Sequence, residues 1–309
     1  MLALRHAVIA AVAVCAGNAA QAAVLNLSAP VGGANVYAIK NFTSNSSDTE
    51  GAIVAGGNVT LSGYRVNDHN VDAFDNYSVV AGGTVTLSNG DIVNGKIYGG
   101  SGVSVTSGTH NGITTVKPVD FKATESYYKT LASSLDALAN TGTVKAVANK
   151  TVISGGGKGG VDIFDVAGNI FLTGSEWKLE NLVAGQTLIF NVSGTTAGFN
   201  PNGIEFTSLS GYNVLFNFYE ATTLDPSGVI GSILAPYATV SKNWGQVNGN
   251  VIVDTWNSTI QINANHYFTA VDVPGLNTGS STAVPEPASI ALFMAGLAAA
   301  GIARRRRKA

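Results

Sequence analysis

Short β-branched runs that alternate with glycine and asparagine dominate the chain between residues 24 and 268. Within these runs apolar residues occupy every second position, as in Val59-Thr60-Leu61 and Val85-Thr86-Leu87. A period of two places apolar side chains on one face of a strand, and Gly and Asn mark the turns between strands. The pattern therefore predicts a mainly β body built from short strands.

A weak internal repeat indicates how these strands are arranged. Residues 55–62, Ala-Gly-Gly-Asn-Val-Thr-Leu-Ser, recur 26 positions later as residues 81–88, Ala-Gly-Gly-Thr-Val-Thr-Leu-Ser. A looser copy follows at residues 98–105, and residues 231–235 resemble residues 51–55. Units of roughly 17–26 residues are typical of coils that stack on one another. We expect a β-solenoid (β-helix-like) fold; the alternative is a β-sandwich whose hairpins share turn residues.

One segment, from Asp120 to Asn140, breaks the β pattern. Its apolar residues recur at spacings of three, four and seven, the period of an amphipathic helix. The stripe consists of Phe121, Tyr128, Leu131, Leu135 and Leu138. Thr124 is a candidate N-cap, with Glu125 in the first turn, and Asn140 is a candidate stop signal. We expect one helix of about four to five turns packed alongside the sheet.

Strands resume after the helix and continue to the end of the body. They are expected at Thr143–Val147, Thr151–Ile153, Ile163–Val166, Asn169–Leu172, Gln186–Val192, Val214–Phe218, Val229–Ile233 and Val247–Val253. From Val271 to Ala283 the composition changes to Gly, Ser, Thr and Pro, which predicts a linker.

The first 22 residues have the features of an export signal. A polar start at Arg5 precedes the apolar stretch Ala7–Ala16, and Ala20-Gln21-Ala22 fits a small-x-small cleavage site. We therefore place the mature start near Ala23. Cys15, the only cysteine, falls inside this signal, so the mature chain has no disulfide and no thiol chemistry.

Three features follow one another in the last 26 residues. The first is Val284-Pro285-Glu286-Pro287, in which the two prolines hold the chain extended and present Glu286 to a processing enzyme. An uncharged run of 16 residues, 288–303, is next and is slightly shorter than the ~17–25 residues of a spanning helix. The tail ends on a basic cluster, which predicts that this end stays on the cytoplasmic side. The cluster consists of Arg304, Arg305, Arg306, Arg307 and Lys308.

This order of motif, apolar run and basic cluster resembles the PEP-CTERM sorting signal of Gram-negative bacteria. The resemblance implies an exosortase-like processing enzyme as partner, transient anchoring in the inner membrane, and a final location at the cell surface or in the extracellular matrix. The alternative is an ordinary single-span anchor. The expected organisation is a signal peptide (1–22), a β-rich domain (23–270), a linker (271–283) and a sorting signal (284–309).

The charge of the body argues against anionic partners. Of the 17 Lys and Arg, 11 lie outside the two signals, against 18 of the 19 Asp and Glu, which leaves a net charge of −7. Arg65 is the only arginine of the body. An acidic, arginine-poor surface argues against nucleic acid and against anionic membrane as partners.

The body resembles the choice-of-anchor A domain, an adhesin-like family of bacterial surface proteins. The matching segments are residues 51–57, 119–121, 231–238 and 247–252, the last leading to Asn265-His266-Tyr267-Phe268. The resemblance implies no catalytic residue and no cofactor. A helix beside β coils is also the layout of bacterial ice-binding β-solenoids, an analogy of architecture alone.

The best chemical candidate in the body is the polar cluster from Arg65 to Asp72. Asp68, Asn70 and Asp72 are spaced like the start of a Ca²⁺ loop, but the Gly and distal Glu of such a loop are missing. We therefore expect a solvated loop and no metal site. With few histidines and no cysteine in the body, a transition-metal site is not expected.

Aromatic residues are the candidate ligand contacts. Trp244, Trp256 and Tyr237 could stack on a sugar or a protein partner, and the alternative for each is ordinary core packing. Together the features favour an exported structural or adhesive protein whose ligand is an exopolysaccharide or a surface protein. A secreted carbohydrate-active enzyme or lectin is the alternative. An ice-binding protein is a further one, which the irregular repeats disfavour because regularly spaced threonines would be needed.

Overall fold

The computed structural model describes most of the chain between the two predicted signals. The described residues are 23–148, 150–168, 170–173, 176–199 and 204–277. The predicted signal peptide (1–22) and sorting signal (284–309) lie outside them. No helix of the described part is long and apolar enough to cross a membrane, and the predicted apolar run 288–303 is not part of it.

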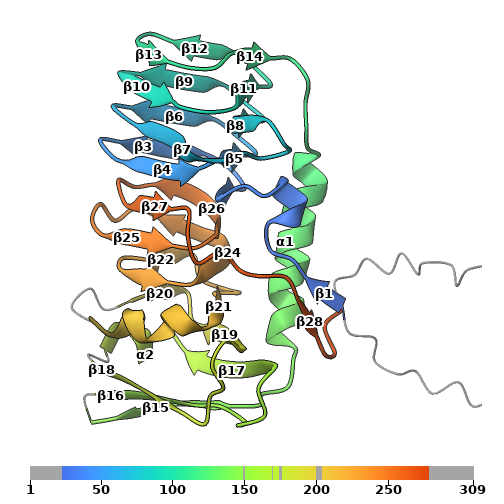
Figure 1. Ribbon diagram of the computed structural model, residues 1–309, viewed down its shortest axis with the longest axis vertical. Coiled ribbons are helices and arrows are strands. Elements are labelled where there is room, and N and C mark those ends of the chain that lie inside the picture. Colours follow the sequence, from blue (N-terminus) through green and yellow to red (C-terminus); the bar gives the residue numbers. More distant parts are fainter. Residues whose placement is uncertain (1–22, 149, 169, 174–175, 200–203, 278–309) are drawn as a thin grey trace, which may run out of the picture.

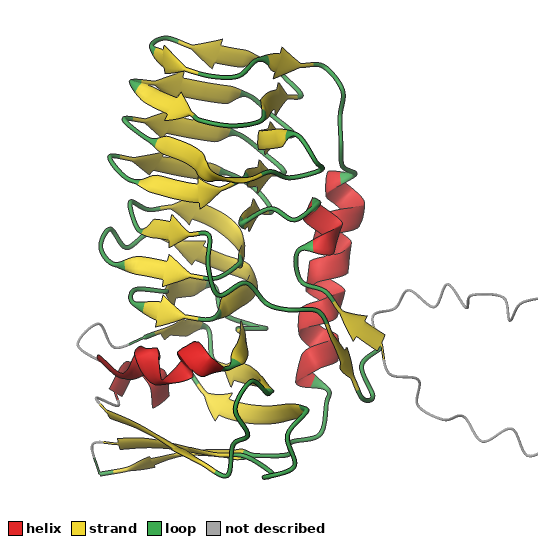
Figure 2. Cartoon of the chain, viewed as in Figure 1, coloured by secondary structure: helices red, strands yellow, loops and turns green. Residues whose placement is uncertain are grey.

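The described body is mainly β, and parallel ladders stack it into coils with three faces (Figures 1 and 2). The helix face contains β17 (Val161–Ala167), β19 (Thr187–Ser193), β21 (Asn213–Asn217), the start of β24 (Ser232–Val240) and of β26 (Val251–Asn257), β2 (Val36–Ala38), β5 (Ile53–Ala55), β8 (Tyr77–Ala81), β11 (Lys96–Gly99) and β14 (Ile113–Thr114).

The two other faces continue each coil around the stack. The threonine face, named for its outward side chains, contains β20 (Thr196–Gly198), β22 (Thr223–Asp225), the ends of β24 and β26, β3 (Phe42–Asn45), β6 (Val59–Ser62), β9 (Val85–Ser88) and β12 (Val103–Val105). The third face contains β23 (Val229–Ile230), β25 (Gln246–Asn248), β27 (Gln261–Asn263), β4 (Asp48–Gly51), β7 (Arg65–Val71), β10 (Gly90–Ile92) and β13 (Gly108–Thr109).

The coils do not stack in sequence order. The chain enters at β2, in the middle of the stack, and adds coils in one direction as far as β14. Helix α1 (Phe121–Asp136) then runs back along the stack, and the chain adds coils from β17 towards the middle. The last coil meets the first, since Val251 pairs with Val36 and Trp256 pairs with Phe42.

The predicted helix is present, with different ends. It spans Phe121–Asp136, and its N-cap is Asp120, whose side chain accepts hydrogen bonds from the Lys122 and Ala123 amides. Thr124, the predicted N-cap, instead lies buried in the first turn and donates its hydroxyl to the Asp120 carbonyl. The helix ends before the predicted stop at Asn140.

The apolar stripe of α1 packs on the helix face as expected. Tyr128, Leu131 and Leu135 are fully buried, in one cluster with outward residues of the helix-face strands such as Ile189 and Leu215. Burial of a Leu side chain of this kind stabilises a protein by about 1.5–3 kcal/mol. This packing on the sheet stabilises α1, which has no other α-helix beside it in the described chain.

Two buried asparagines fix the position of α1 on the sheet. Asn191 donates its side-chain amide to the Leu135 carbonyl over 2.7 Å, and Asn217 donates to the Ala132 carbonyl over 2.9 Å. Asn217 also donates to the Asn191 side chain on the neighbouring strand. These bonds satisfy helix carbonyls inside an apolar layer, where an unpaired polar group costs about 1–3 kcal/mol.

One end of the stack is covered by a separate cap. The cap consists of β15 (Thr143–Val147), β16 (Lys150–Ser154), β18 (Glu176–Glu180), α2 (Ile170–Thr173) and the 3-10 helix η2 (Ile204–Gly211). The prediction of a strand at Asn169–Leu172 is wrong, because the described part of that segment lies in α2. Phe171, from α2, is buried against Trp177, with ring centroids 4.9 Å apart.

The two ends of the body meet beside α1. Strand β1 (Ala23–Leu25) pairs antiparallel with β28 (Val271–Val273), and a short 3-10 helix, η1 (Ala29–Val31), follows β1. The linker predicted from Val271 therefore differs from the structure. Val273 and Leu276 are buried, because their apolar side chains join the cluster under the helix.

The strand ladders bear on the two fold expectations. Val59, Thr60 and Leu61 pair with Val85, Thr86 and Leu87, so the 26-residue repeat corresponds to neighbouring coils. Most ladders are parallel, whereas the hairpins of the alternative β-sandwich would be antiparallel. A nearly closed parallel sheet with a helix alongside has a β-helix-like layout.

Candidate binding face

The threonine face carries two columns of outward polar side chains, all of them Thr or Ser except Asn257. In the first column Thr196, Thr223, Thr239 and Thr255 are consecutive partners in the parallel ladders. The Thr223 hydroxyl lies 3.3 Å from that of Thr196. In a parallel sheet identical positions repeat at about 4.8 Å, so the column presents a regular row of hydroxyl and methyl groups.

The second column continues the surface over the other half of the stack. Asn257, Thr43, Thr60, Thr86 and Ser104 are consecutive ladder partners. Both columns lie on one sheet, since β24 and β26 each pair on both sides. The surface extends over eight strands of the described chain, which at about 4.8 Å per step corresponds to about 35 Å.

The side chains under this face form a fixed support. Val59, Leu61, Val85 and Leu87 point inward and are fully buried. At one edge, the side-chain oxygen of Asn41 accepts a hydrogen bond from the backbone amide of Asn58. The side-chain oxygen of Asn58 in turn accepts one from the backbone amide of Thr84 on the next coil, and both bonds are 2.8 Å long. Buried β-branched columns and asparagine ladders hold the outward threonines in register.

Charges on this face are confined to its edges and are paired. Lys40 contacts Asp254 at 3.1 Å, and Lys242 lies 3.9 Å from Asp225. The outward residues of the two columns themselves are Thr, Ser and Asn. The surface can therefore offer hydrogen-bond donors and acceptors without attracting ions of either sign.

The three candidate aromatic contacts have different environments. Trp256 is fully buried and stacks on Phe42, so the expected ligand contact through Trp256 is wrong; its ring fills the core between the first and last coils. Trp244 is 51% exposed and Tyr237 is 40% exposed. Tyr237 lies within β24, whereas Trp244 lies in the connection between β24 and β25.

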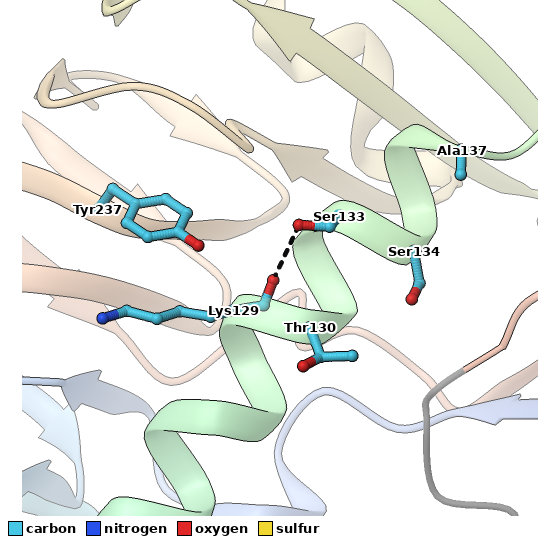
Figure 3. Close-up of a pocket in the computed structure, with 6 residues that line it drawn as sticks. All are labelled: Lys129, Thr130, Ser133, Ser134, Ala137 and Tyr237. Carbon is cyan, nitrogen blue, oxygen red and sulfur yellow. Dashed lines mark hydrogen bonds between the residues drawn. The ribbon is translucent and has the colours of Figure 1, made fainter.

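A shallow groove lies beside Tyr237, between β24 and α1 (Figure 3). Thr130, Ser133 and Ser134 line it from the helix, and the Lys129 ammonium lies 5.4 Å from the centre of the Tyr237 ring. Lys129 also pairs with Glu125, whose hydrogen bond raises the pKa of the lysine. The Ser133 hydroxyl donates to the Lys129 carbonyl, and Ala137 and the Tyr237 ring add apolar surface to the groove.

The polar cluster from Arg65 to Asp72 lies on the third face. All of it except Asp72 forms strand β7 rather than the expected solvated loop. The buried Asn67 side chain holds this strand in place, because it accepts a hydrogen bond from the Val71 amide and donates one to the Ser78 hydroxyl. Arg65 pairs with Asp68 at 3.1 Å. No group of three or more His, Cys, Asp and Glu in the described ranges is arranged to hold a metal ion.

Acidic side chains gather on the same face next to β7. Burial raises the pKa of Asp48, and the negative charges of Asp68 and Glu50 raise it further, while Gln261 and Arg65 act in the opposite direction. Each carboxylate has a partner: Gln261 donates to Asp48, the Ala264 amide donates to Glu50, and Arg65 donates to Asp68. The second carboxylate oxygen of Asp68, Oδ1, is buried without a hydrogen-bond partner.

The sequence did not reveal the threonine columns, although their residues are visible in it. Thr43 and Thr60 are 17 positions apart, Thr60 and Thr86 are 26 apart, and Asn257 joins the column from the far end of the chain. These irregular intervals suggested that the threonines were not aligned. A search for Thr at the centre of each Val-Thr-Leu run would have found part of the second column.

Comparison with known proteins identifies the family of the body. Residues 28–264 match the family described as "Putative Ice-binding-like adhesive domain". This match covers most of the chain, so the protein belongs to that family, which agrees with the adhesin-like expectation although the choice-of-anchor A name is not the one matched. Residues 283–308 match the PEP-CTERM protein-sorting motif. No curated protein and no solved structure matches the chain.

Proposed function

We propose that this protein is an exported adhesive module, built as a β-solenoid, that contacts its ligand through the threonine face. The observation that carries the proposal is the pair of aligned, uncharged columns, which includes Thr239, Thr255, Thr60 and Thr86. A rigid polar surface of this length suits many weak contacts along an extended ligand. Membership of an adhesive family supports a binding role without catalysis.

The chemistry of the face favours neutral, hydroxyl-rich ligands such as exopolysaccharides. The body carries a net charge of −7, which repels anionic polymers at low salt. Threonine and asparagine side chains both donate and accept hydrogen bonds, as sugar hydroxyls do. Trp244, half exposed in the connection that follows β24, is the side chain that we expect to stack on a sugar ring.

The sorting motif supports the route to the surface. The PEP-CTERM match implies recognition of Pro285, Glu286 and Pro287 by an exosortase-like enzyme. We propose that residues 288–303 anchor the chain transiently in the inner membrane, with Arg304 to Lys308 on the cytoplasmic side. Removal of this tail would then leave the β body at the cell surface or in the extracellular matrix.

Ice binding is a second candidate, and the same columns favour it. Ordered rows of threonine methyl and hydroxyl groups on a flat sheet can match a periodic solid as well as a polymer. The columns are regular although the intervals between their threonines in the sequence are not, so the irregular repeats do not disfavour ice binding. A carbohydrate-active enzyme has less in its favour, because the groove beside Tyr237 is lined by no carboxylate and Asp48, Glu50 and Asp68 of the third face each accept a hydrogen bond from a neighbouring group.

A binding panel distinguishes these functions. The processed protein, purified from the producing cells, is incubated with a neutral polysaccharide, an anionic polysaccharide and growing ice crystals, and new reducing or unsaturated ends are assayed in parallel. We expect retention on the neutral polymer without new ends. Incorporation into ice alone would favour the second candidate. Catalytic release of ends, lost in Asp68→Asn, would contradict the proposal.

A further inference from the structure

The two ends of the coil stack differ. At one end the cap of β15, β16, β18, α2 and η2 covers the core, and Ile153, Phe171 and Leu209 are buried there. At the other end β12, β13 and β14 form the last coil, and each has a neighbouring strand on one side only (Figure 1). The described chain therefore leaves this end as an open edge on all three faces.

The apolar core reaches this open end uncovered. Val85 and Leu87 are fully buried, whereas their partners in the last coil, Val103 and Val105, are only partly buried although they pack on the same cluster. On the helix face Ile113 lies over the buried Ile97 and is 52% exposed. These three side chains point along the interior columns and lack the coil that would cover them.

The backbone of β12 has hydrogen-bonding groups on the open side. The Gly102 carbonyl accepts from β9, and the Thr106 amide donates to β9. Because successive residues of a parallel strand bond to opposite sides, Val103 and Val105 direct their amide and carbonyl groups away from the stack. A strand that lay along β12 would find two donors and two acceptors in register.

The last coil itself carries no ionised side chain that would repel such a strand, and the Asp91 carboxylate of the preceding coil accepts hydrogen bonds from the Thr109 amide and hydroxyl. Residues 97–116 contain no Asp, Glu, Lys or Arg. Natural sheets usually protect exposed edges with charged side chains or proline. In a body of net charge −7, residues 97–116 add no Asp, Glu, Lys or Arg to the repulsion between two copies that approach end to end.

We propose that the open end binds a second copy of this chain, end to end, about a two-fold axis through Ser104. The axis pairs β12 antiparallel with β12 of the second copy, so that Val103 and Val105 exchange backbone hydrogen bonds across it. A half-turn about this axis exchanges the third face with the helix face. Strand β13 of one copy therefore lies opposite β14 of the second copy. The interior columns then continue through both copies.

In this arrangement Ser104 lies opposite Ser104 of the second copy. The two form a non-hydrogen-bonded pair, in which the side chains are closer together than in a hydrogen-bonded pair. Ser104→Lys and Ser104→Glu each place like charges opposite each other, which weakens such a pair. An equal mixture of the two variants places opposite charges there. Thr60→Lys is the matched control, since Thr60 occupies the same column two coils inside the stack.

Sedimentation velocity of the processed protein over a range of concentrations measures the dimer. We expect wild type and Thr60→Lys to dimerise equally, each Ser104 variant to dimerise about fivefold more weakly, and the mixture to regain the wild-type dissociation constant. A wild-type protein that remains monomeric at all concentrations overturns the proposal. Ser104 variants that dimerise like wild type, or a mixture that stays weak, also overturn it.

Discussion

Trp256 stacks on Phe42 across the seam where the last coil meets the first, with ring centroids 5.9 Å apart and ring planes 3° from parallel. The two residues come from β26 and β3 and are direct ladder partners. Both are fully buried. This contact joins the two halves of a stack that the chain builds from separate directions.

The seam contact predicts a large loss of stability in Trp256→Ala. Removal of a fully buried aromatic side chain leaves a cavity and costs about 3–5 kcal/mol. Denaturant unfolding followed by circular dichroism measures the change. Trp244→Ala is the control, because that side chain is half exposed, and it should change the free energy of unfolding by no more than about 0.5 kcal/mol. Equal effects of the two substitutions would contradict the seam.

Helix α1 is expected to depend on its buried stripe. Leu135→Ala, or Leu131→Ala, should lower the free energy of unfolding by about 2–5 kcal/mol, since both side chains are fully buried against the helix face. Ser126→Ala, on the exposed side of the same helix, serves as the control. An unchanged thermal midpoint in both leucine variants would refute the packing of α1 on the coils.

The acidic patch of the third face predicts a pH-dependent effect of Asp48→Asn. Burial and the charges of Asp68 and Glu50 raise the pKa of Asp48, so its ionised form destabilises the folded state. The variant should be more stable than wild type at neutral pH, by no more than about 0.5 kcal/mol, because Asp48 is partly exposed and solvent screens its charge. This advantage should shrink as pH falls through the raised pKa and vanish below the ordinary aspartate value. A variant less stable than wild type at pH 7 would contradict this electrostatic account.

The location of the protein is expected to depend on the sorting motif rather than on the apolar run alone. Replacement of Pro285, Glu286 and Pro287 by Ala removes the extended segment that the processing enzyme would recognise. Cell fractionation should then find an unprocessed, heavier chain retained in the inner membrane. If the variant reaches the surface at the mass of the processed wild type, the motif does not direct processing.

Local patterns in the sequence were sufficient to predict the kinds of element in the fold. Alternation in Val59-Thr60-Leu61 gave strands, the stripe from Phe121 to Leu138 gave one packed helix, and the 26-residue repeat gave neighbouring coils. Each of these signals depends only on side chains a few positions apart. The capping residue was harder to predict, since both Asp120 and Thr124 are good N-caps and only the buried position of Thr124 decides between them.

The order of the coils and the binding face could not be predicted in this way. The seam between Val36 and Val251 joins residues from opposite ends of the body, and no repeat or period in the sequence marks it. The threonine columns depend on that seam, because Asn257 precedes Thr43 in the second column. Burial of Trp256 follows from the same contact. A residue's place on the surface was therefore set by long-range stacking.

The central claim is that the threonine face binds the ligand, and a matched pair of lysine substitutions tests it most directly. Thr60→Lys places a charge in the middle of the second column, whereas Gln246→Lys places the same charge at an exposed position of the third face. Binding of both processed variants to the neutral polysaccharide retained by wild type is measured by titration. The account predicts a loss of at least about tenfold in affinity for Thr60→Lys, which corresponds to 1.4 kcal/mol, and none for Gln246→Lys. Equal affinity in the two variants, or a loss only in Gln246→Lys, would contradict it.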